Sequence, residues 1–600
     1  MATTAQQPTT TPKPTRATID NVKDTVESIV VAFVLAFVFR AFIVEAFVIP
    51  TGSMAVTLYG DQATNTCSTC GYEYARGIAD HEVRDARNNR NLSVQLRCPN
   101  CDTLVDHIPP ARMQRPDSGD RILVQKWAWA LSQNSGSAGP QRWDVAVFKD
   151  PRDGTTNFIK RLVGLPGEVL EIIDGDIYAV PLSVLAEKEP GLVEALDQLR
   201  REVYQDGERR PDPSAAALFR QRYEELNQRL LPHLRIQRKT PRSQTALWFN
   251  VYNDDFHPAA APGGHPPSPV GWWPVDQAAK TAWTTADKEI LFDSRDANSY
   301  AIEFAGKDID DFVAYNHSSS PGRSAAGEYY VGDLRLRFVW LPDAGEGSLT
   351  LQMNRDQDSF IAEIRRDGTV IVEKHTVKGA TGRPVVIGTG GLDRPIANGQ
   401  AVEVEFTNVD YRVTLSLDGQ PLVMSRDEQY APDLVRALAH RGKSEVLPSR
   451  VTIAARDLRC RLRHLVLERD VYYRSTEQIE EAIRDPRVGT VRLNPYYRWP
   501  GWGTAGTPIM LRQAREVQGK HYPDEYFMLG DNSPASKDSR QWWEIGPHLK
   551  HMGEEYQLGT VPGDQLLGKA FFVYWPAGYR PSWAANIGII PNVGRMRWIR

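Results

Sequence analysis

The chain has little cysteine, no marked excess of either charge and few long apolar runs. Five cysteines in 600 residues are too few for a scaffold held by disulfides. Lys+Arg total 71 and Asp+Glu 75, and this formal charge of −4 argues against a protein whose main ligand is nucleic acid. A mean hydropathy of −0.43 excludes a polytopic transporter. The length allows about four globular units.

Two common hydrolase signatures are also missing. The sequence contains neither His-Glu-x-x-His, which places zinc ligands on a helix, nor the Gly-x-Ser-x-Gly elbow. None of its 12 histidines lies in a stretch that suggests a Ser-His-Asp triad. A catalytic serine would therefore need another base, and a lysine kept neutral by burial is the known alternative.

One apolar run stands out, from Ile29 to Ile49 within residues 27–49, and it is interrupted only by Arg40 and Glu45. About 20 such residues match a bilayer core of about 30 Å, so we expect a transmembrane helix after a disordered tail at residues 1–26. A cleavable signal peptide is the alternative, but Pro50 follows where a small-x-small cleavage pattern should stand. Counts of Lys and Arg on the two sides do not decide the orientation.

A serine and a lysine are the candidate catalytic residues. Gly52 allows a tight turn that exposes the Ser53 hydroxyl, although most Gly-Ser pairs are plain turns. In a strand over residues 155–163, Lys160 shares a face with two apolar neighbours, whereas Arg161 points the other way, into water. Desolvation would lower the pKa of such an amine. An edge-strand lysine that keeps its amine in water is the alternative.

Five segments together resemble type I signal peptidases, in the order that this family has them. They are residues 40–54 (RAFIVEAFVIPTGSM), 119–124 (GDRILV), 157–168 (NFIKRLVGLPGE), 528–540 (MLGDNSPASKDSR) and 561–576 (VPGDQLLGKAFFVYWP). The resemblance implies a mainly β chain with a signal-peptidase-type catalytic fold built from residues 50–60, 115–180 and 470–600. It also implies a single-pass protein of the cytoplasmic membrane whose catalytic part lies on the extracytoplasmic face.

The resemblance assigns the chemistry to Ser53 as nucleophile and Lys160 as general base. The N–H of Ser53 and the hydroxyl of Thr51 would stabilise the oxyanion, and catalysis would need no cofactor. Val56 stands where relatives usually have proline, and Ser533 where they often have arginine. Neither departure removes a group that the chemistry uses.

Four residues of the segment 528–540 have implied supporting roles. Ser536 would orient the lysine by a hydrogen bond. Asp538 and Arg540 would form an ion pair that holds the loop, and Asp531 would tie the same turn together.

An insert at residues 61–114 carries two C-x-x-C pairs. Four thiolates on two tight turns suit a tetrahedral metal, so we expect a zinc-ribbon-like insert. Two disulfides are the alternative in an oxidising compartment, and a redox-active pair is a third. The candidate ligands are Cys67, Cys70, Cys98 and Cys101.

The family resemblance is interrupted by two further inserts. Apolar stripes at helical spacing predict a short helical insert at residues 181–242. Period-two alternation with Asp-Gly turns predicts a β-sandwich (jelly roll) at residues 243–469, which resembles laminin-G and concanavalin-like folds. We expect the lone Cys460 in its core, and we expect proteolysis not to need this sandwich.

Two groups of residues in the sandwich allow more than one interpretation. Trp248, Trp272, Trp273 and Trp283 would either stack on a sugar or fill the core. The acidic group around residues 308–311 would either bind calcium or form a solvated turn.

The favoured function is thus a membrane-anchored serine endopeptidase that removes signal peptides from exported preproteins. The expected partners are those preproteins, the lipid bilayer, export machinery and, at the sandwich, polysaccharide, with no role for nucleic acid. The alternative is a membrane-tethered polysaccharide-binding protein on an inactive peptidase scaffold. A self-cleaving repressor peptidase, a third hypothesis, conflicts with the apolar N-terminal segment.

Overall fold

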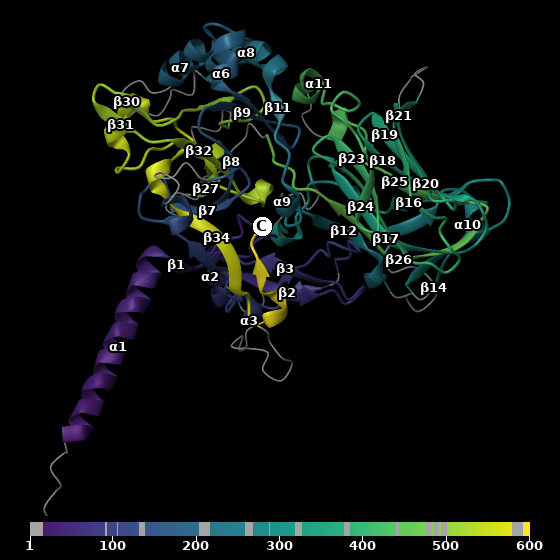
Figure 1. The fold of residues 1–600 in the computed structure, drawn as a ribbon, viewed down its shortest axis with the longest axis horizontal. Coiled ribbons are helices and arrows are strands. Elements are labelled where there is room, and N and C mark those ends of the chain that lie inside the picture. The colour runs from purple at the N-terminus through teal and green to yellow at the C-terminus, as the bar shows by residue number, and fades with distance from the viewer. Residues whose placement is uncertain are drawn as a thin grey trace, which may run out of the picture.

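The computed structural model shows a mainly β protein, as the sequence predicts, with an isolated N-terminal helix (Figure 1). All paired strands run antiparallel. The structure describes residues 16–89, 93–104, 106–130, 139–202, 216–258, 268–286, 288–317, 327–376, 384–439, 443–475, 482–484, 491–493, 501–578 and 592–600.

The first sheet unites all five segments that carry the family resemblance. Its strands come from both ends of the chain, and apolar side chains such as Ile122, Val147 and Val573 form the core on one face. In spatial order they are β1 (Val44–Val48), β6 (Arg121–Gln125), β34 (Leu566–Trp575), β7 (Val145–Lys149), β8 (Asn157–Gly164), β32 (Glu525–Leu529) and β33 (Val561–Pro562), with β35 (Arg597–Trp598) beside β34.

The N-terminal segment differs from the sequence prediction in both of its boundaries. Helix α1 spans Arg16–Phe42, so it begins inside the expected tail and ends before residue 49. Residues Val44–Val48 are instead strand β1, because their alternating side chains pair with β6, with Phe47 opposite Ile122. Within the described residues, no helix has the length and apolar character needed to cross a membrane.

A second sheet and three helices extend the peptidase part. The sheet contains β9 (Glu168–Ile173), β10 (Asp176–Pro181), β11 (Arg235–Ile236) and β29 (Ile509–Leu511). The helices α6 (Leu182–Lys188), α7 (Leu192–Glu202) and α8 (Ala216–Leu230) pack on it through side chains such as Leu196, Leu199 and Tyr223. Because β11 pairs with β10, the expected helical insert returns to the peptidase sheet before residue 242. The sequence also predicts Val203 in the apolar stripe of the first helix and Ser214 as the N-cap of the second; both residues lie outside the described part.

The insert with four cysteines is a small unit with its own core. It contains β2 (Gln62–Thr66), β3 (Glu73–Gly77), α2 (Asp80–Asn88), β4 (Val94–Gln95), β5 (His107–Ile108) and α3 (Pro110–Met113). The four buried cysteines pack there with Ile78, Val94 and Leu96.

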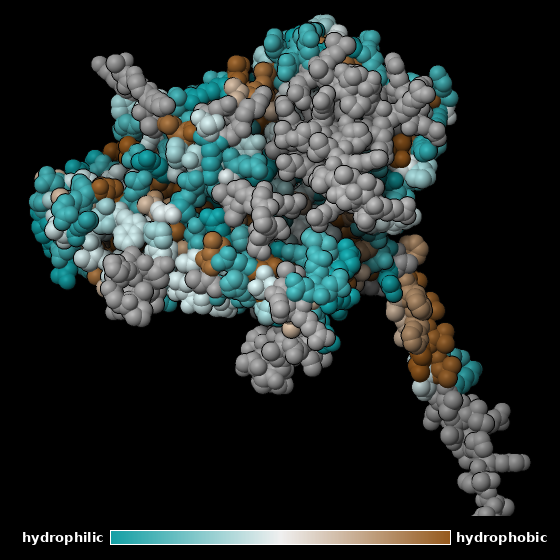
Figure 2. Space-filling model, turned by 180° about the vertical axis from the view of Figure 1, so that it is seen from behind, coloured by the Kyte–Doolittle hydropathy of each residue, from teal (hydrophilic) through white to brown (hydrophobic). Residues whose placement is uncertain are grey.

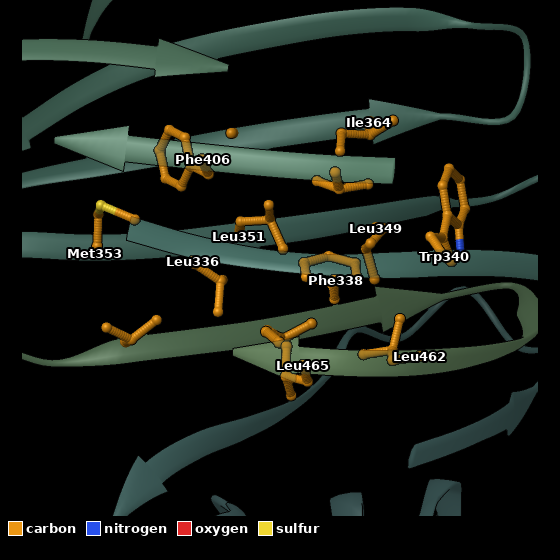
Figure 3. Close-up of a cluster of buried hydrophobic side chains, with 14 of the residues drawn as sticks. Leu336, Phe338, Trp340, Leu349, Leu351, Met353, Ile364, Phe406, Leu462 and Leu465 are labelled. Carbon is orange, nitrogen blue, oxygen red and sulfur yellow. The ribbon is translucent and has the colours of Figure 1, made fainter. Parts of the chain in front are cut away.

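The sandwich is formed by two large sheets whose inner faces make one apolar core (Figure 3). Alternation places Leu336, Phe338 and Trp340 of one sheet against Leu351 and Met353 of the other. One sheet contains β12 (Phe249–Asn253), β14 (Trp283–Ala286), β15 (Glu289–Ser294), β17 (Leu334–Ala344), β22 (Val402–Val409), β23 (Arg412–Leu417), β24 (Gln420–Met424) and β26 (Leu458–Arg469). The other contains β13 (Gly271–Pro274), β16 (Tyr300–Ala305), β18 (Ser348–Arg355), β19 (Asp358–Arg365), β20 (Thr369–Thr376), β21 (Val385–Gly391) and β25 (Val451–Arg456).

Short elements complete the described chain. They are α4 (Trp127–Ala130), α9 (Pro241–Gln244), α10 (Ala279–Ala282), α11 (Leu434–Ala439), the hairpin β30 (Arg515–Val517) and β31 (Lys520–Tyr522), the pair β27 (Ala482–Arg484) and β28 (Val491–Leu493), and 3-10 turns that include η4 (Ala314–Asn316).

In the two ambiguous groups of the sandwich, the tryptophans and the acidic residues, most side chains take part in core packing or ion pairs. Trp272 and Trp283 are buried in the core, whereas Trp273 is exposed. Lys443 binds the carboxylates of Asp308 and Asp310 at 2.8 Å each. Cys460 lies in the core, as predicted.

Candidate active site

The structure brings Ser53 and Lys160 together from positions 107 residues apart. Lys160 Nζ lies 2.6 Å from Ser53 Oγ and 3.0 Å from the carbonyl oxygen of Ile159. Strand β8 carries the lysine into the interior, where it pairs with Ala146 of β7 and is only 4% exposed. Ser53 is also buried. The alternative of a lysine whose amine stays in water is therefore wrong.

The environment of Lys160 favours a neutral amine. The pKa of Lys160 is lowered to about 8, mainly by burial; Arg152 also lowers it, whereas Asp538, Asp531 and Asp150 partly offset this effect. No carboxylate within the described residues forms an ion pair with its Nζ. The amine can therefore serve as a proton acceptor near neutral pH.

The loop that carries Ser53 is held by the segment 528–540. The N–H of Asn532 donates to the carbonyl of Ser53 at 3.1 Å, and its side-chain Nδ2 donates to the carbonyl of Gly52 at 2.8 Å. A Cβ at Gly530 would lie 2.4 Å from the same Ser53 carbonyl, so this position requires glycine. The sequence pattern alone assigns no role to Asn532, although this residue lies in the Gly-Asp-Asn motif of the segment 528–540.

Arg161 departs from the sequence prediction. It was expected in water but is fully buried, and its guanidinium forms two hydrogen bonds of 2.7 Å with Asp531. Strand alternation places Arg161 on the opposite face of β8 from Lys160, as predicted. Other parts of the fold cover that face, and the guanidinium also donates to the carbonyls of Trp143 and Arg600. Asp531 thus ties the turn to β8, since an unpaired arginine there would be costly.

The other supporting residues follow the expectation in part. Arg540 binds Asp538 through bonds of 2.8 and 2.7 Å, and the N–H of Gly530 donates to the same carboxylate at 3.0 Å. Ser533 accepts a hydrogen bond from Arg540 at 2.8 Å. Ser536 is buried, but its Oγ has no hydrogen-bond partner among the described residues, so the expected bond to Lys160 is not formed.

The candidate oxyanion groups lie on the same turn as the nucleophile. Thr51 is exposed two residues before Ser53. The turn itself is closed by a 3.0 Å bond from the N–H of Ala55 to the carbonyl of Gly52, and Met54 anchors it in the core of the first sheet.

The four cysteines of the insert form a compact group of free thiols. Cys67 Sγ lies 3.6 Å from Cys101 Sγ, Cys70 Sγ lies 3.7 Å from Cys98 Sγ, and all four sulfur atoms lie within 4.8 Å of one another. A tetrahedral zinc with bonds of about 2.3 Å separates its sulfur ligands by about 3.8 Å. These residues fit zinc, and the separations are too long for disulfides.

Both C-x-x-C pairs have the same turn geometry. The N–H of Gly71 donates to the carbonyl of Cys67, and the N–H of Asp102 donates to that of Cys98. Gly71 and Asp102 each have a positive φ, of 78° and 62°. The repeated turn aims two sulfur atoms from each pair at one point.

Comparisons with known proteins agree with the first sheet. Residues 111–192 and 492–575 match the family described as signal peptidase, peptidase S26; Ser53 lies outside the matched residues. The chain is 29% identical over 158 residues to signal peptidase I of Rickettsia typhi, which covers 26% of this chain and 43% of the relative. It is 31% identical over 150 residues to signal peptidase I of Rickettsia akari, covering 24% and 40%. The chain therefore spans less than half the length of these relatives.

Solved structures resemble the sandwich only distantly. The carbohydrate binding module CBM66 from Bacillus subtilis covers 33% of this chain and 96% of its own, with 14% identity and a TM-score of 0.21. The laminarinase from Rhodothermus marinus covers 37% and 98%, with 12% identity and a TM-score of 0.25. Likeness at this level carries no argument about a ligand. The sequence matches, in contrast, show that two separate stretches of this chain are similar to the family described as signal peptidase, peptidase S26.

Proposed function

We propose that the chain is a serine endopeptidase that cleaves signal peptides from exported preproteins with Ser53 as nucleophile and Lys160 as general base. The observation that carries the proposal is the 2.6 Å approach of Ser53 Oγ to the Nζ of a buried lysine. Family similarity supports the reaction class.

In the first half of the reaction, neutral Lys160 accepts the hydroxyl proton while Ser53 Oγ attacks the scissile carbonyl carbon. The negative charge that develops on the carbonyl oxygen would be stabilised by the N–H of Ser53 and the hydroxyl of Thr51. The ammonium of Lys160 then gives its proton to the leaving amine, and an ester to Ser53 remains. In the second half, Lys160 takes a proton from water as the water attacks the ester; the resulting ammonium then returns a proton to Ser53 Oγ as the C–O bond breaks and the acid leaves.

The supporting residues keep the two reacting groups together. Asp538, paired with Arg540, anchors the turn next to Ser53, and the Arg161–Asp531 pair fixes that turn to the lysine strand. Ser536 would complete the site only if its hydroxyl reaches Lys160 in the substrate complex.

The proposed substrates reach the enzyme at a lipid surface. Helix α1 extends from the body and carries exposed apolar side chains along its length (Figure 2), including Phe33, Leu35 and Phe37. We assign this surface to lipid because signal sequences are apolar and lie in the same bilayer. The catalytic part would then lie on the extracytoplasmic face, with export machinery as a source of preproteins and a structural zinc at the four cysteines.

The test is cleavage of a preprotein with an Ala-x-Ala site by the detergent-solubilised full chain. Wild type should release the signal peptide, whereas Ser53→Ala and Lys160→Ala should lose at least about 1,000-fold in kcat/KM. Lys188→Ala, at an exposed position of α6, is the matched control and should retain activity. Cleavage that survives at either catalytic position would refute the assignment of roles.

A further inference from the structure

A short turn of the sandwich insert reaches the loop that carries Ser53. Turn η4 (Ala314–Asn316) lies between β16 and β17 in the chain, yet its Tyr315 packs in the peptidase core rather than in the core of the sandwich. Its following residue, His317, accepts a 2.9 Å hydrogen bond at its carbonyl from Arg76 of strand β3. The turn therefore contacts both the insert with four cysteines and the candidate active site.

Asn316 forms a two-way amide pair with Asn532. Asn316 Nδ2 donates to Asn532 Oδ1 at 2.6 Å, and Asn532 Nδ2 donates to Asn316 Oδ1 at 2.7 Å. The second hydrogen of Asn532 Nδ2 is left for the carbonyl of Gly52, 2.8 Å away. Asn316 thus binds both the oxygen and the nitrogen of the Asn532 amide. This fixes the orientation of the amide, so that its second N–H points at the carbonyl of Gly52.

Tyr315 holds the same loop by packing. A Cβ at Gly52 would lie 2.0 Å from Tyr315 Cε1, so the tyrosine ring lies directly on the backbone before Ser53. Its hydroxyl donates to the carbonyl of Asp61 at 3.0 Å, and its ring packs against Tyr59 with centroids 5.7 Å apart. The ring therefore closes the outer side of the serine loop.

We propose that Asn316 of the sandwich insert is a positioning residue for Ser53, so that the insert helps to build the peptidase site; this inference rests on the proposed function. Asn316 acts through Asn532, which fixes the carbonyls of Gly52 and Ser53. The serine hydroxyl is thereby kept at the lysine amine, a geometry whose loss by about 1 Å costs up to about 100-fold in rate.

This inference reverses the expectation that proteolysis does not need the sandwich. A deletion of residues 245–468 removes Asn316 and Tyr315 together, and leaves the side chain of Asn532 without its partner. It also removes Asp311, whose carboxylate binds Arg474 next to the segment 528–540. A folded deletion chain should therefore cleave poorly.

The decisive experiment compares single substitutions in the full chain, with the same preprotein as substrate. Asn316→Ala should lower kcat by about 10- to 100-fold while KM changes by less than about two-fold, because Asn316 orients the nucleophile through Asn532. Asn316→Asp keeps the acceptor for Asn532 Nδ2 and should recover part of kcat. Asn298→Ala, at an exposed position of the same insert, is the control and should behave as wild type.

A second readout does not depend on activity. Hydrogen–deuterium exchange of the segment 52–58 should be faster in Asn316→Ala than in wild type and unchanged in Asn298→Ala. If Asn316→Ala does not fold, as judged by thermal unfolding, Asn316→Gln takes its place, since its longer side chain displaces the amide without removing it.

The outcomes separate this inference from the proposed function. An unchanged kcat, or a raised KM with kcat intact, in the folded Asn316 variant overturns the positioning role. If wild type and Ser53→Ala show the same activity, the proposed function fails. In that case the hydrogen–deuterium exchange measurement still tests the inference. Exchange of the segment 52–58 that is as slow in the Asn316 variant as in wild type would overturn it.

Discussion

At the scale of single residues, the site depends on a lysine that is buried without a carboxylate bound to it. Its charged form is destabilised because water is excluded, and the nearest hydroxyl, that of Ser53, stands at hydrogen-bond distance. The neighbouring residue on the same strand, Arg161, is also buried, but its guanidinium forms an ion pair with Asp531. The pKa is therefore lowered for Lys160 and raised for Arg161, because only the arginine has a carboxylate partner on its face of the strand.

The activity should consequently follow the titration of Lys160. Only the neutral amine accepts a proton, so kcat/KM should rise with pH through about 8 and then level off, well below the 10.5 of an unperturbed lysine. Arg152→Gln removes a positive charge that lowers the pKa of Lys160, so the inflection should move to higher pH. The measurement is kcat/KM from about pH 6 to about pH 10.

Arg84→Gln, at an exposed position of α2, is the control for Arg152→Gln and should leave the inflection in place. A wild-type profile that still rises near pH 10 would show that the amine is not desolvated in the free enzyme, and would contradict the role of Lys160.

At the scale of elements, the insert with four cysteines is ordered around two matching turns. Each turn has a residue with positive φ just after its second cysteine. The second turn also forms hydrogen bonds with another part of the chain. Asn100, for example, donates to the carbonyls of Asn253 and Phe256 in the sandwich insert at 3.2 Å. A metal at the four sulfur atoms would therefore stabilise an element that other parts of the chain contact.

Protein purified without chelator should contain about one zinc per chain. Cys101→Ser should lose the metal and unfold at a lower temperature, because a structural zinc contributes directly to folding. Cys460→Ser is the matched control, since Cys460 is buried in the sandwich core, far along the chain from the four cysteines; it should keep its zinc. Metal analysis and thermal unfolding give both readouts.

A chain that holds no metal and has no free thiol at the four positions would contradict the zinc site and favour disulfides. Metal retained by Cys101→Ser at the wild-type level would also count against this ligand set.

At the scale of the whole molecule, the sandwich is joined to the peptidase part by buried charge. Arg355 of β18 binds Asp333, which directly precedes β17 of the other sandwich sheet, and it binds Asp176 of β10 at 2.7 Å. Lys239, just before α9, binds Asp410 of the sandwich, and its Nζ lies 2.7 Å from Asp470. These pairs raise the cost of separating the two parts, because each separation would leave a charge without its partner.

The exposed apolar surface of α1 should bind lipid. A chain with Phe33→Ser, Leu35→Ser and Phe37→Ser, which changes positions that are 61%, 62% and 66% exposed, should float with vesicles of neutral and anionic phospholipid far less than wild type. Val435→Ser on α11 is the control, since it removes a side chain that is 73% exposed on another helix. Equal flotation of the triple variant and wild type would contradict a lipid role for α1.

Much of this organisation could be predicted from the sequence because it depends on local pattern. Alternation of apolar residues identified the strands of the sandwich, such as Leu334–Ala344, and the spacing of the cysteines identified a candidate metal site. The strand phase around Lys160 put its side chain in the interior. Each of these inferences uses only neighbours along the chain.

Other features were decided by contacts between distant segments. Residues Val44–Val48 are as apolar as a membrane helix, and only pairing with β6 makes them a strand. Arg161 is buried because Asp531, 370 residues away, neutralises it, and Asn316 reaches Asn532 only because a loop of the sandwich turns towards the peptidase core. The sequence by itself determined the strands of the sandwich, the resemblance to a family and the pair of candidate catalytic residues; tertiary structure alone decided which of their neighbours are charged, paired and close, because those interactions depend on distance in space.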